Sequence, residues 1–378
     1  MIRLVGNFIF GSVLFWGCSG LLRADDERAV QVDGTYTGAV FGNVHGGYRN
    51  QSTYMGVAEI GITTDTEKLG LWKNGRFFVG SLFSHGPGIT RFVGDYQDPV
   101  YIAYEVPAQV SEYWYEHRFF NERLAVKIGK QDSCSTFFYL DSKADFFNSS
   151  FTCPPGTCMP TLPHNTHGVT CSLDLLNDAV FKVAVHDAGH GVHEFWESEF
   201  EDAHFDMQIE KRYSLFESLP GFVYCGGWYD TSSIELNDRA FKGNYGFSIG
   251  IDQTVWRKKP CRYHRTPLQE VTAFTQIGTY KKDRSELRWY YDLGLTCRGF
   301  LRSRPEDHVG IACTTVCLSP GFRAAEGLPY RFESAYECFY KFQVTDNAML
   351  QPNLQYIVHP GGQYKDALLI GLAFQVAF

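Results

Sequence analysis

Hydrophobic and polar residues alternate along three long stretches of the chain. Between residues 330 and 344, the even positions include Tyr330, Phe332, Tyr336, Tyr340, Phe342 and Val344, and the odd positions include Arg331, Glu333, Glu337, Lys341 and Gln343. Stretches 287–298 and 205–215 repeat this two-residue period. Because successive side chains of a β-strand point to opposite faces, each stretch is predicted to be a strand that separates an apolar medium from a polar one.

Twelve further stretches are strand-like, which makes fifteen predicted strands, and no amphipathic helical pattern of comparable length competes with them. A strand of about 9 to 11 residues crosses a bilayer, and single-chain bacterial barrels usually have an even number of strands. The sequence therefore predicts an all-β fold: a transmembrane antiparallel β-barrel of sixteen strands with long extracellular loops. The twelve stretches are 35–44, 54–63, 76–84, 110–120, 123–129, 180–185, 221–230, 245–255, 270–280, 308–318, 350–358 and 366–378.

The pattern at the end of the chain distinguishes a membrane barrel from a soluble β-sandwich or propeller, whose strands also alternate between apolar and polar residues. Ile370, Leu372, Phe374 and Val376 alternate with small or polar residues, and the chain ends on Phe378. A terminal alternating strand with a final aromatic residue resembles the signal by which outer-membrane barrels are recognised for assembly. Aromatic residues near strand ends, as in the girdles of membrane barrels, favour the same interpretation.

The first 24 residues differ from the rest. Arg3 precedes an apolar stretch over 8–16, and the small residue Ala24 precedes acidic residues. This pattern is typical of a secretory signal peptide, with lipoprotein processing at Cys18 as the alternative. We expect residues 1–24 to be the signal peptide, 25–33 a short N-terminal segment and 34–378 the barrel domain.

Composition and charge exclude other classes of protein. The 22 Tyr and 31 Phe argue against intrinsic disorder. After residue 24, no apolar stretch is as long as the about 18 residues that a membrane-spanning helix needs. The formal net charge is −8, and a chain without Arg3 and Arg23 would have 32 basic and 42 acidic residues. Because an acidic chain has no basic field for phosphates, nucleic acid is not expected as a partner.

Short sequence blocks are spread over the chain, in a fixed order between Gly34 and Phe378. They are 46–47, 54–56, 69–78, 93–97, 113–116, 124–130 (LAVKIGK), 147–151, 219–221, 226–231, 333–337, 350–357 and 359–362. No single block is specific, but in this order they resemble the carbohydrate-selective porins, the OprB-like family. The resemblance implies a monomeric sixteen-stranded outer-membrane porin that passes glucose-like sugars by diffusion.

The polar faces of the predicted strands provide candidate pore-lining residues. Charged groups can replace the hydrogen bonds that sugar hydroxyls lose with their hydration shell, and an aromatic face can stack on a sugar ring. Each charge has an alternative role in a salt bridge that stiffens the wall, because a polar lumen is the rule in such barrels. The candidates are Glu112, Trp114, Glu116, Arg118, Glu210, Arg288, Asp292, Arg298, Arg331, Glu333, Glu337 and Lys341.

The cysteine content is unusual for a porin. Ten cysteines follow the leader, an even number that suits disulfides in an exported chain, although the sequence does not define the pairing. Four of them lie in or beside the Pro-rich segment 131–170, which we expect to fold into the mouth of the barrel. These disulfide candidates are Cys134, Cys153, Cys158 and Cys171.

A His- and Glu-rich segment could be mistaken for a metal site. It contains no HExxH motif and two glycines, so an exposed acidic loop between strands explains it, and neither a metal nor another cofactor is expected. The chain also lacks a P-loop and a GxGxxG motif that opens a helix. The segment's residues are His186, Asp187, His190, His193, Glu194, Glu197, Glu199 and His204.

We therefore predict a non-enzymatic, passive and sugar-preferring porin of the bacterial outer membrane. Its expected partners are small sugars, outer-membrane lipid and the barrel-assembly machinery, which would read the strand that ends at Phe378. The alternatives are a cysteine cross-linked envelope protein with a narrow pore, and a barrel-borne hydrolase whose residues come from separate strands.

Overall fold

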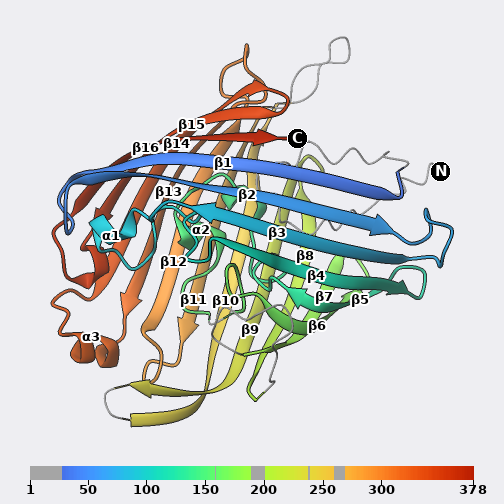
Figure 1. The fold of residues 1–378 in the computed structure, drawn as a ribbon, viewed down its shortest axis with the longest axis horizontal. Helices are drawn as coiled ribbons and strands as arrows, with labels where there is room; N and C mark the ends of the chain where they lie inside the picture. Colours follow the sequence, from blue (N-terminus) through green and yellow to red (C-terminus); the bar gives the residue numbers. More distant parts are fainter. Residues whose placement is uncertain (1–27, 158, 189–200, 237–238, 259–268) are drawn as a thin grey trace.

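The computed structural model describes residues 28–157, 159–188, 201–236, 239–258 and 269–378. Its strands form one closed antiparallel barrel in which each strand pairs with its neighbours in the sequence (Figure 1). The first and last strands close the ring, because Thr35 pairs with Ala377 and Phe41 pairs with Gly371. Complete closure satisfies every strand edge, which a sheet in a bilayer requires.

The sixteen strands and three α-helices have the following bounds. The strands are β1 (Val30–His45), β2 (Gln51–Asp65), β3 (Gly75–His85), β4 (Ala108–Phe119), β5 (Leu124–Gln131), β6 (Thr166–Asp174), β7 (Ala179–Asp187), β8 (Ala203–Leu215), β9 (Leu219–Leu236), β10 (Arg239–Arg257), β11 (Glu270–Tyr280), β12 (Leu287–Arg298), β13 (His308–Leu318), β14 (Phe332–Thr345), β15 (Ala348–Val358) and β16 (Ala367–Ala377). The helices are α1 (Thr90–Val93), α2 (Ser149–Thr152) and α3 (Pro320–Glu326). None of the described helices is long and apolar enough to cross a membrane.

Side chains alternate between the outer surface and the lumen as predicted. In β8, Asp206 and Gln208 are buried inside the barrel, whereas Phe205, Met207 and Ile209 are exposed on its outer surface. An outer face of large apolar side chains suits lipid, and an inner face of polar side chains suits a lumen.

The predicted count of sixteen strands is confirmed, and the strand without a predicted counterpart is β6. Each of the other fifteen overlaps a predicted stretch. β6 has 9 residues, and only Val169, Cys171 and Leu173 form its apolar face, opposite small side chains such as Thr170 and Ser172. It also lies at the end of the Pro-rich segment, which the sequence predicts to be loop up to Thr170.

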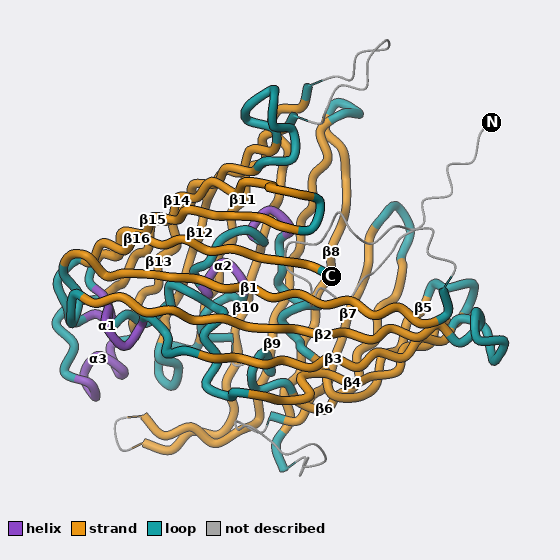
Figure 2. Tube along the Cα trace, turned by 45° about the horizontal axis from the view of Figure 1, so that its top comes forward, coloured by secondary structure: helices purple, strands orange, loops and turns teal. Residues whose placement is uncertain are grey.

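The connections differ between the two ends of the barrel. At the end where β1 begins and β16 finishes, several connections are tight turns, for example 120–123, 175–178, 216–218 and 346–347. We call this the turn end. At the opposite end, which we call the loop end, the connections 86–107 and 132–165 are long and carry helices α1 and α2. Figure 2 shows α2 and the loop around it enclosed by the strands.

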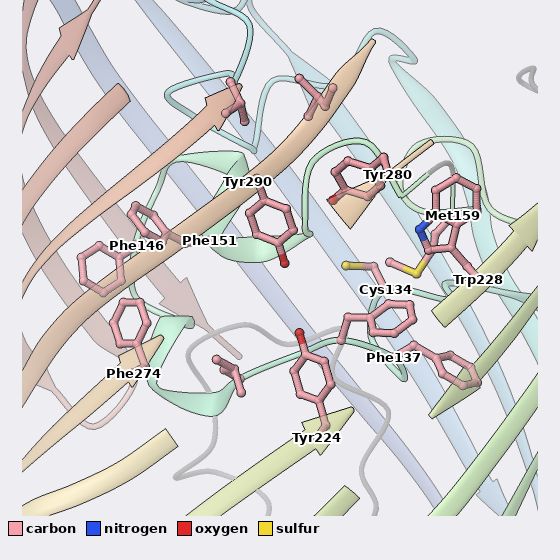
Figure 3. Packing of buried hydrophobic residues seen from close by; sticks show 14 of the residues in the cluster. Cys134, Phe137, Phe146, Phe151, Met159, Tyr224, Trp228, Phe274, Tyr280 and Tyr290 are labelled. Carbon is pink, nitrogen blue, oxygen red and sulfur yellow. The ribbon is translucent and has the colours of Figure 1, made fainter. Parts of the chain in front are cut away.

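The two long connections, hereafter the first inner loop (86–107) and the second inner loop (132–165), form a hydrophobic core inside the barrel. Phe146 of the second inner loop packs against Phe274 of the wall with ring centroids 5.7 Å apart and against Phe339 at 4.9 Å. Figure 3 shows Phe146 and Phe151 beside Phe274. The first inner loop contributes Phe92 and Val93 to a second cluster, which also contains Phe41 of the wall and Phe147 of the second inner loop. The loops thus narrow the lumen.

Candidate functional site

Side chains of the barrel wall anchor the second inner loop near its start. Asp206 on β8 accepts a 2.7 Å hydrogen bond from Ser133 Oγ, and Gln208 Oε1 accepts one of 2.7 Å from the Phe138 amide. All four residues are buried. Because buried polar groups need partners, the inward face of β8 sets the position of this part of the loop.

Two ion pairs anchor the middle of the second inner loop. Lys143 Nζ lies 2.7 Å from Asp292 Oδ2 on β12. Asp145 accepts hydrogen bonds of 2.6 Å from both Lys341 Nζ on β14 and His308 Nδ1 on β13. Burial alone would raise the pKa of the Asp145 carboxyl, but Lys341 and His308 together hold this pKa well below its usual range. Asp145 is therefore a charged anchor.

Glu337 on β14 anchors the stretch before α2. Its two carboxylate oxygens accept hydrogen bonds from the amides of Phe147 at 2.7 Å and Asn148 at 2.9 Å, and Asn353 Nδ2 donates to it at 2.6 Å. The side chain is only 1% exposed, so its hydrogen-bonding capacity serves the loop.

Glu333, also on β14, anchors the first inner loop in the same way. It accepts hydrogen bonds from the amides of Tyr96 at 2.7 Å and Gln97 at 3.0 Å, and from the Gly361 amide at 2.5 Å. One buried wall carboxylate therefore joins this loop to the connection between β15 and β16.

A cavity of about 390 Å³ lies between the two inner loops, and we call it the loop-end cavity. Aromatic faces and hydroxyl groups of both loops line it together with carboxylates, and Glu59 on β2 contributes from the wall. Its lining includes Glu59, Asp98, Tyr101, Tyr104, Glu105, Asp132, Ser135, Ser149, Thr152, Thr161 and His164.

A second cavity of about 270 Å³, the Trp114 cavity, lies between the second inner loop and strands β4 to β9 toward the turn end. Charges of both signs line it in pairs. Arg118 Nε lies 3.1 Å from Glu116 Oε1, and Lys182 Nζ lies 2.8 Å from Glu210 Oε2. The lining also includes Trp114, whose ring centroid is 5.3 Å from Lys127 Nζ.

A third cavity of about 340 Å³, the His308 cavity, lies beyond Asp141 and adjoins β8 to β14. Ser135 lines both the loop-end cavity and the Trp114 cavity. Asp141, Arg212 and Phe222 line both the Trp114 cavity and the His308 cavity. The loop-end cavity therefore adjoins the Trp114 cavity, and the Trp114 and His308 cavities lie side by side toward the turn end. Together the three cavities form the candidate permeation path.

The twelve candidate pore residues divide into three groups. Trp114, Glu116, Arg118 and Glu210 line the Trp114 cavity, and Arg298 and Lys341 line the His308 cavity. Glu112, Asp292, Glu333 and Glu337 point into the barrel but are at most 1% exposed, because they hold the inner loops. Arg288 and Arg331 are exposed at the loop end of β12 and beside the start of β14, and they line none of these three cavities.

Sequence reasoning missed the carboxylates of the loop-end cavity. Glu59, Asp98, Glu105 and Asp132 line it, but three of them lie on the inner loops, where no two-residue period marks a lumen face. The available signal was the length of the connection between β3 and β4, since long loops in compact barrels are usually functional.

Cys134, Cys153 and Cys171 are free thiols in the structure, and Cys158 lies outside the described residues. The predicted disulfide staple is thus not formed among the three described cysteines. Burial raises the pKa of the Cys134 thiol well above its usual range, and contact with the Cys153 thiol raises it further.

The histidine-rich segment is only partly described. His186, Asp187 and His204 are buried at the loop end of β7 and β8, where His204 lies between Asp206 and Asp230 with N···O distances of 3.3 and 3.1 Å. Within the described ranges no group of three or more His, Cys, Asp or Glu residues is arranged to hold a metal ion. The other predicted members, His190, His193, Glu194, Glu197 and Glu199, lie outside the described residues.

Comparisons with known proteins agree with this architecture. Porin B of Pseudomonas aeruginosa is 21% identical over 394 residues, which cover 91% of this chain and 86% of that protein. The high-pH structure of Pseudomonas putida OprB superposes with a TM-score of 0.83 at 19% identity, over 93% of this chain and 94% of that one. The outer-membrane channel DcaP of Acinetobacter baumannii has a TM-score of 0.55 at 9% identity, over 92% of this chain and 97% of that one.

The likeness to these two solved structures establishes the fold, and a family profile adds the assignment. The profile that describes the carbohydrate-selective porins of the OprB family matches residues 49–378. The match covers the barrel from the β1–β2 connection to the last residue. The chain therefore belongs to the OprB family of carbohydrate-selective porins.

Proposed function

We propose that this protein is a bacterial outer-membrane porin through which small, glucose-like sugars diffuse passively. The observation that carries the proposal is the set of adjoining cavities beside the two inner loops inside a closed barrel. Membership of a carbohydrate-selective porin family supports it.

The chemistry of the path suits a sugar. Ion-paired carboxylates and amines such as Glu116 with Arg118 keep lone pairs and N–H groups that can replace part of a sugar's hydration shell. Trp114, Tyr101 and Tyr104 add aromatic surface along the path. Because conduction requires weak and distributed binding, no single strong anchor is expected.

Swelling of proteoliposomes tests the proposal. We expect vesicles that contain the folded barrel to swell readily in glucose and progressively more slowly in maltose and maltotriose. Vesicles with heat-unfolded protein are the control. If a verified folded barrel gives no swelling in glucose, the porin function is wrong, and the cross-linked envelope protein or the hydrolase becomes the function to pursue.

We also propose that the chain acts as a monomer and is assembled through its last strand. β16 pairs with β15 and β1, and Phe378 exchanges backbone hydrogen bonds of 3.0 and 2.9 Å with Gly34. Phe378→Ser should lower the fraction of protein that reaches the heat-modifiable, folded form in the outer membrane. Equal assembly of Phe378→Ser and wild type would contradict a role for this residue as an assembly signal.

A scaffold joined by disulfides and a catalytic role have less support, because the family profile that matches the chain describes carbohydrate-selective porins. We propose a channel without catalysis. A ladder of covalent oligomers in a gel run without reductant would favour the envelope scaffold instead.

A further inference from the structure

The loop-end cavity differs in charge from the other two cavities. Glu59, Asp98, Glu105 and Asp132 line it, and its described lining contains no Lys or Arg. Among the described residues, none of these four carboxylates forms an ion pair within 4 Å. Their visible partners are neutral: Thr35 Oγ1 donates to Glu59, and Thr90 Oγ1 and the Val100 amide donate to Asp98.

The cavities toward the turn end are balanced instead. Arg118, Lys127, Lys182 and Arg212 line the Trp114 cavity together with five carboxylates, and Lys182 and Arg118 are paired there. Lys127 of this cavity is close enough to lower the pKa of Asp132 by its charge, although burial dominates and raises that pKa. The uncompensated negative charge is therefore concentrated at the loop end.

The position of the cavity makes this charge relevant to every permeant. The two inner loops fill much of the lumen, and the space between them continues through Ser135 into the Trp114 cavity. A solute that enters the path from the loop end meets these carboxylates before it meets the amines of the Trp114 cavity. Tyr101 and Tyr104 offer ring faces in the same cavity, and Ser149, Thr152 and Thr161 offer hydroxyls.

We propose that the loop-end cavity makes this porin select neutral and cationic solutes, amino sugars in particular, over anionic sugars such as uronic acids. This inference rests on the proposed porin function and names its substrate class. An ammonium group replaces a sugar hydroxyl and is attracted by the carboxylates, whereas a sugar carboxylate is repelled by them.

Glu105 allows the sharpest test, because it is an exposed loop residue whose replacement leaves the buried anchors intact. The zero-current potential in a KCl gradient at about 0.1 M salt, where screening extends over about 10 Å, gives the ratio of cation to anion permeability. We expect wild type to prefer K⁺, and Glu105→Gln to lower the ratio by up to about tenfold, because one unit charge at about 6 Å in water changes the K⁺ and Cl⁻ permeabilities by about threefold each in opposite directions. Glu105→Lys should lower it further.

Glu326→Gln is the matched control, since Glu326 is exposed on α3 at the same end of the barrel and does not line the cavity. It should leave the ratio unchanged. In swelling assays, glucosamine should enter at least as fast as glucose, and glucuronate clearly more slowly.

These outcomes distinguish a failure of the proposed porin function from a failure of the proposed charge selectivity. If folded protein forms no pore, the proposed function fails. If it conducts and passes glucose but prefers Cl⁻, or if Glu105→Lys leaves both the permeability ratio and glucuronate uptake unchanged, the porin function stands and the charge selectivity is wrong.

Discussion

Lys341 Nζ donates a 2.6 Å hydrogen bond to Asp145 Oδ1, which joins strand β14 to the second inner loop across the lumen. Both side chains are largely buried, at 8% and 13% exposure. His308 on β13 contacts the other oxygen of the same carboxylate. This contact determines where the loop lies and therefore how wide the path beside it is.

We expect Lys341→Met to release the middle of the second inner loop. Removal of one partner of a buried pair costs about 3 to 5 kcal/mol, because the other charge remains desolvated. The pore current should become larger and noisier in single-channel recordings. Lys73→Met is the control, since Lys73 and Glu67 form an exposed pair of 3.6 Å at the turn end. Identical currents from both variants and wild type would contradict the role of the anchor.

The same anchor should make stability depend on acid pH. The folded-state pKa of Asp145 is depressed, so its stabilising contribution is complete above the ordinary Asp pKa of about 4 and is lost as pH falls toward the folded-state value. Wild type should therefore melt higher than Asp145→Asn by a constant amount between about pH 7 and 5, with a smaller difference below about pH 4. A difference in melting temperature that does not change with pH would argue against a charged Asp145.

The charge selectivity of the loop-end cavity should weaken on acidification. Burial raises the pKa of both Asp98 and Asp132 to about 6. Both carboxyls are therefore mostly ionised at about pH 7.5 and mostly neutral at about pH 5. Zero-current potentials over this range should show the K⁺ preference fall with a midpoint near pH 6. A K⁺ preference that stays constant over this pH range would show that these two aspartates do not contribute to the charge selectivity.

Gly226 on β9 should be sensitive to a single added methyl group. A Cβ at this position would lie 2.6 Å from the backbone oxygen of Met207 and 2.7 Å from the Phe138 ring, which is fully buried. Overpacking of this kind costs about 1 to 3 kcal/mol, so Gly226→Ala should lower the melting temperature. Gly42→Ala is the control, because its nearest new contact would be an ordinary 3.5 Å. Equal melting temperatures would mean that the loop does not pack tightly here.

The two-residue period predicted nearly all of the barrel because lipid and lumen impose opposite demands on alternate side chains. It failed at β6, where Thr170 and Ser172 oppose only three apolar residues. In the other strands large apolar residues such as Met207 and Ile209 make the pattern plain. The prediction thus depended on the contrast between faces, which is weak in a short strand beside a Pro-rich loop.

The roles of the lumen charges could not be predicted in the same way. Parity placed Glu337 on the inner face, but its partner, the Phe147 amide, lies 190 residues away in the sequence. Asp292 and Lys143 are likewise separated by 149 residues. Local patterns do not contain such contacts, so a carboxylate that anchors a loop is indistinguishable from one that faces the path.

Single-channel current of the refolded protein, titrated with glucose, tests the central claim most directly. The account predicts discrete conductance steps in salt alone, and a saturable reduction of the current as glucose occupies the path beside Trp114 and Ser135. Larger maltosaccharides should reduce the current less because they do not fit past the inner loops. Folded barrels without conductance steps, or steps that no sugar affects, would contradict a sugar-selective pore.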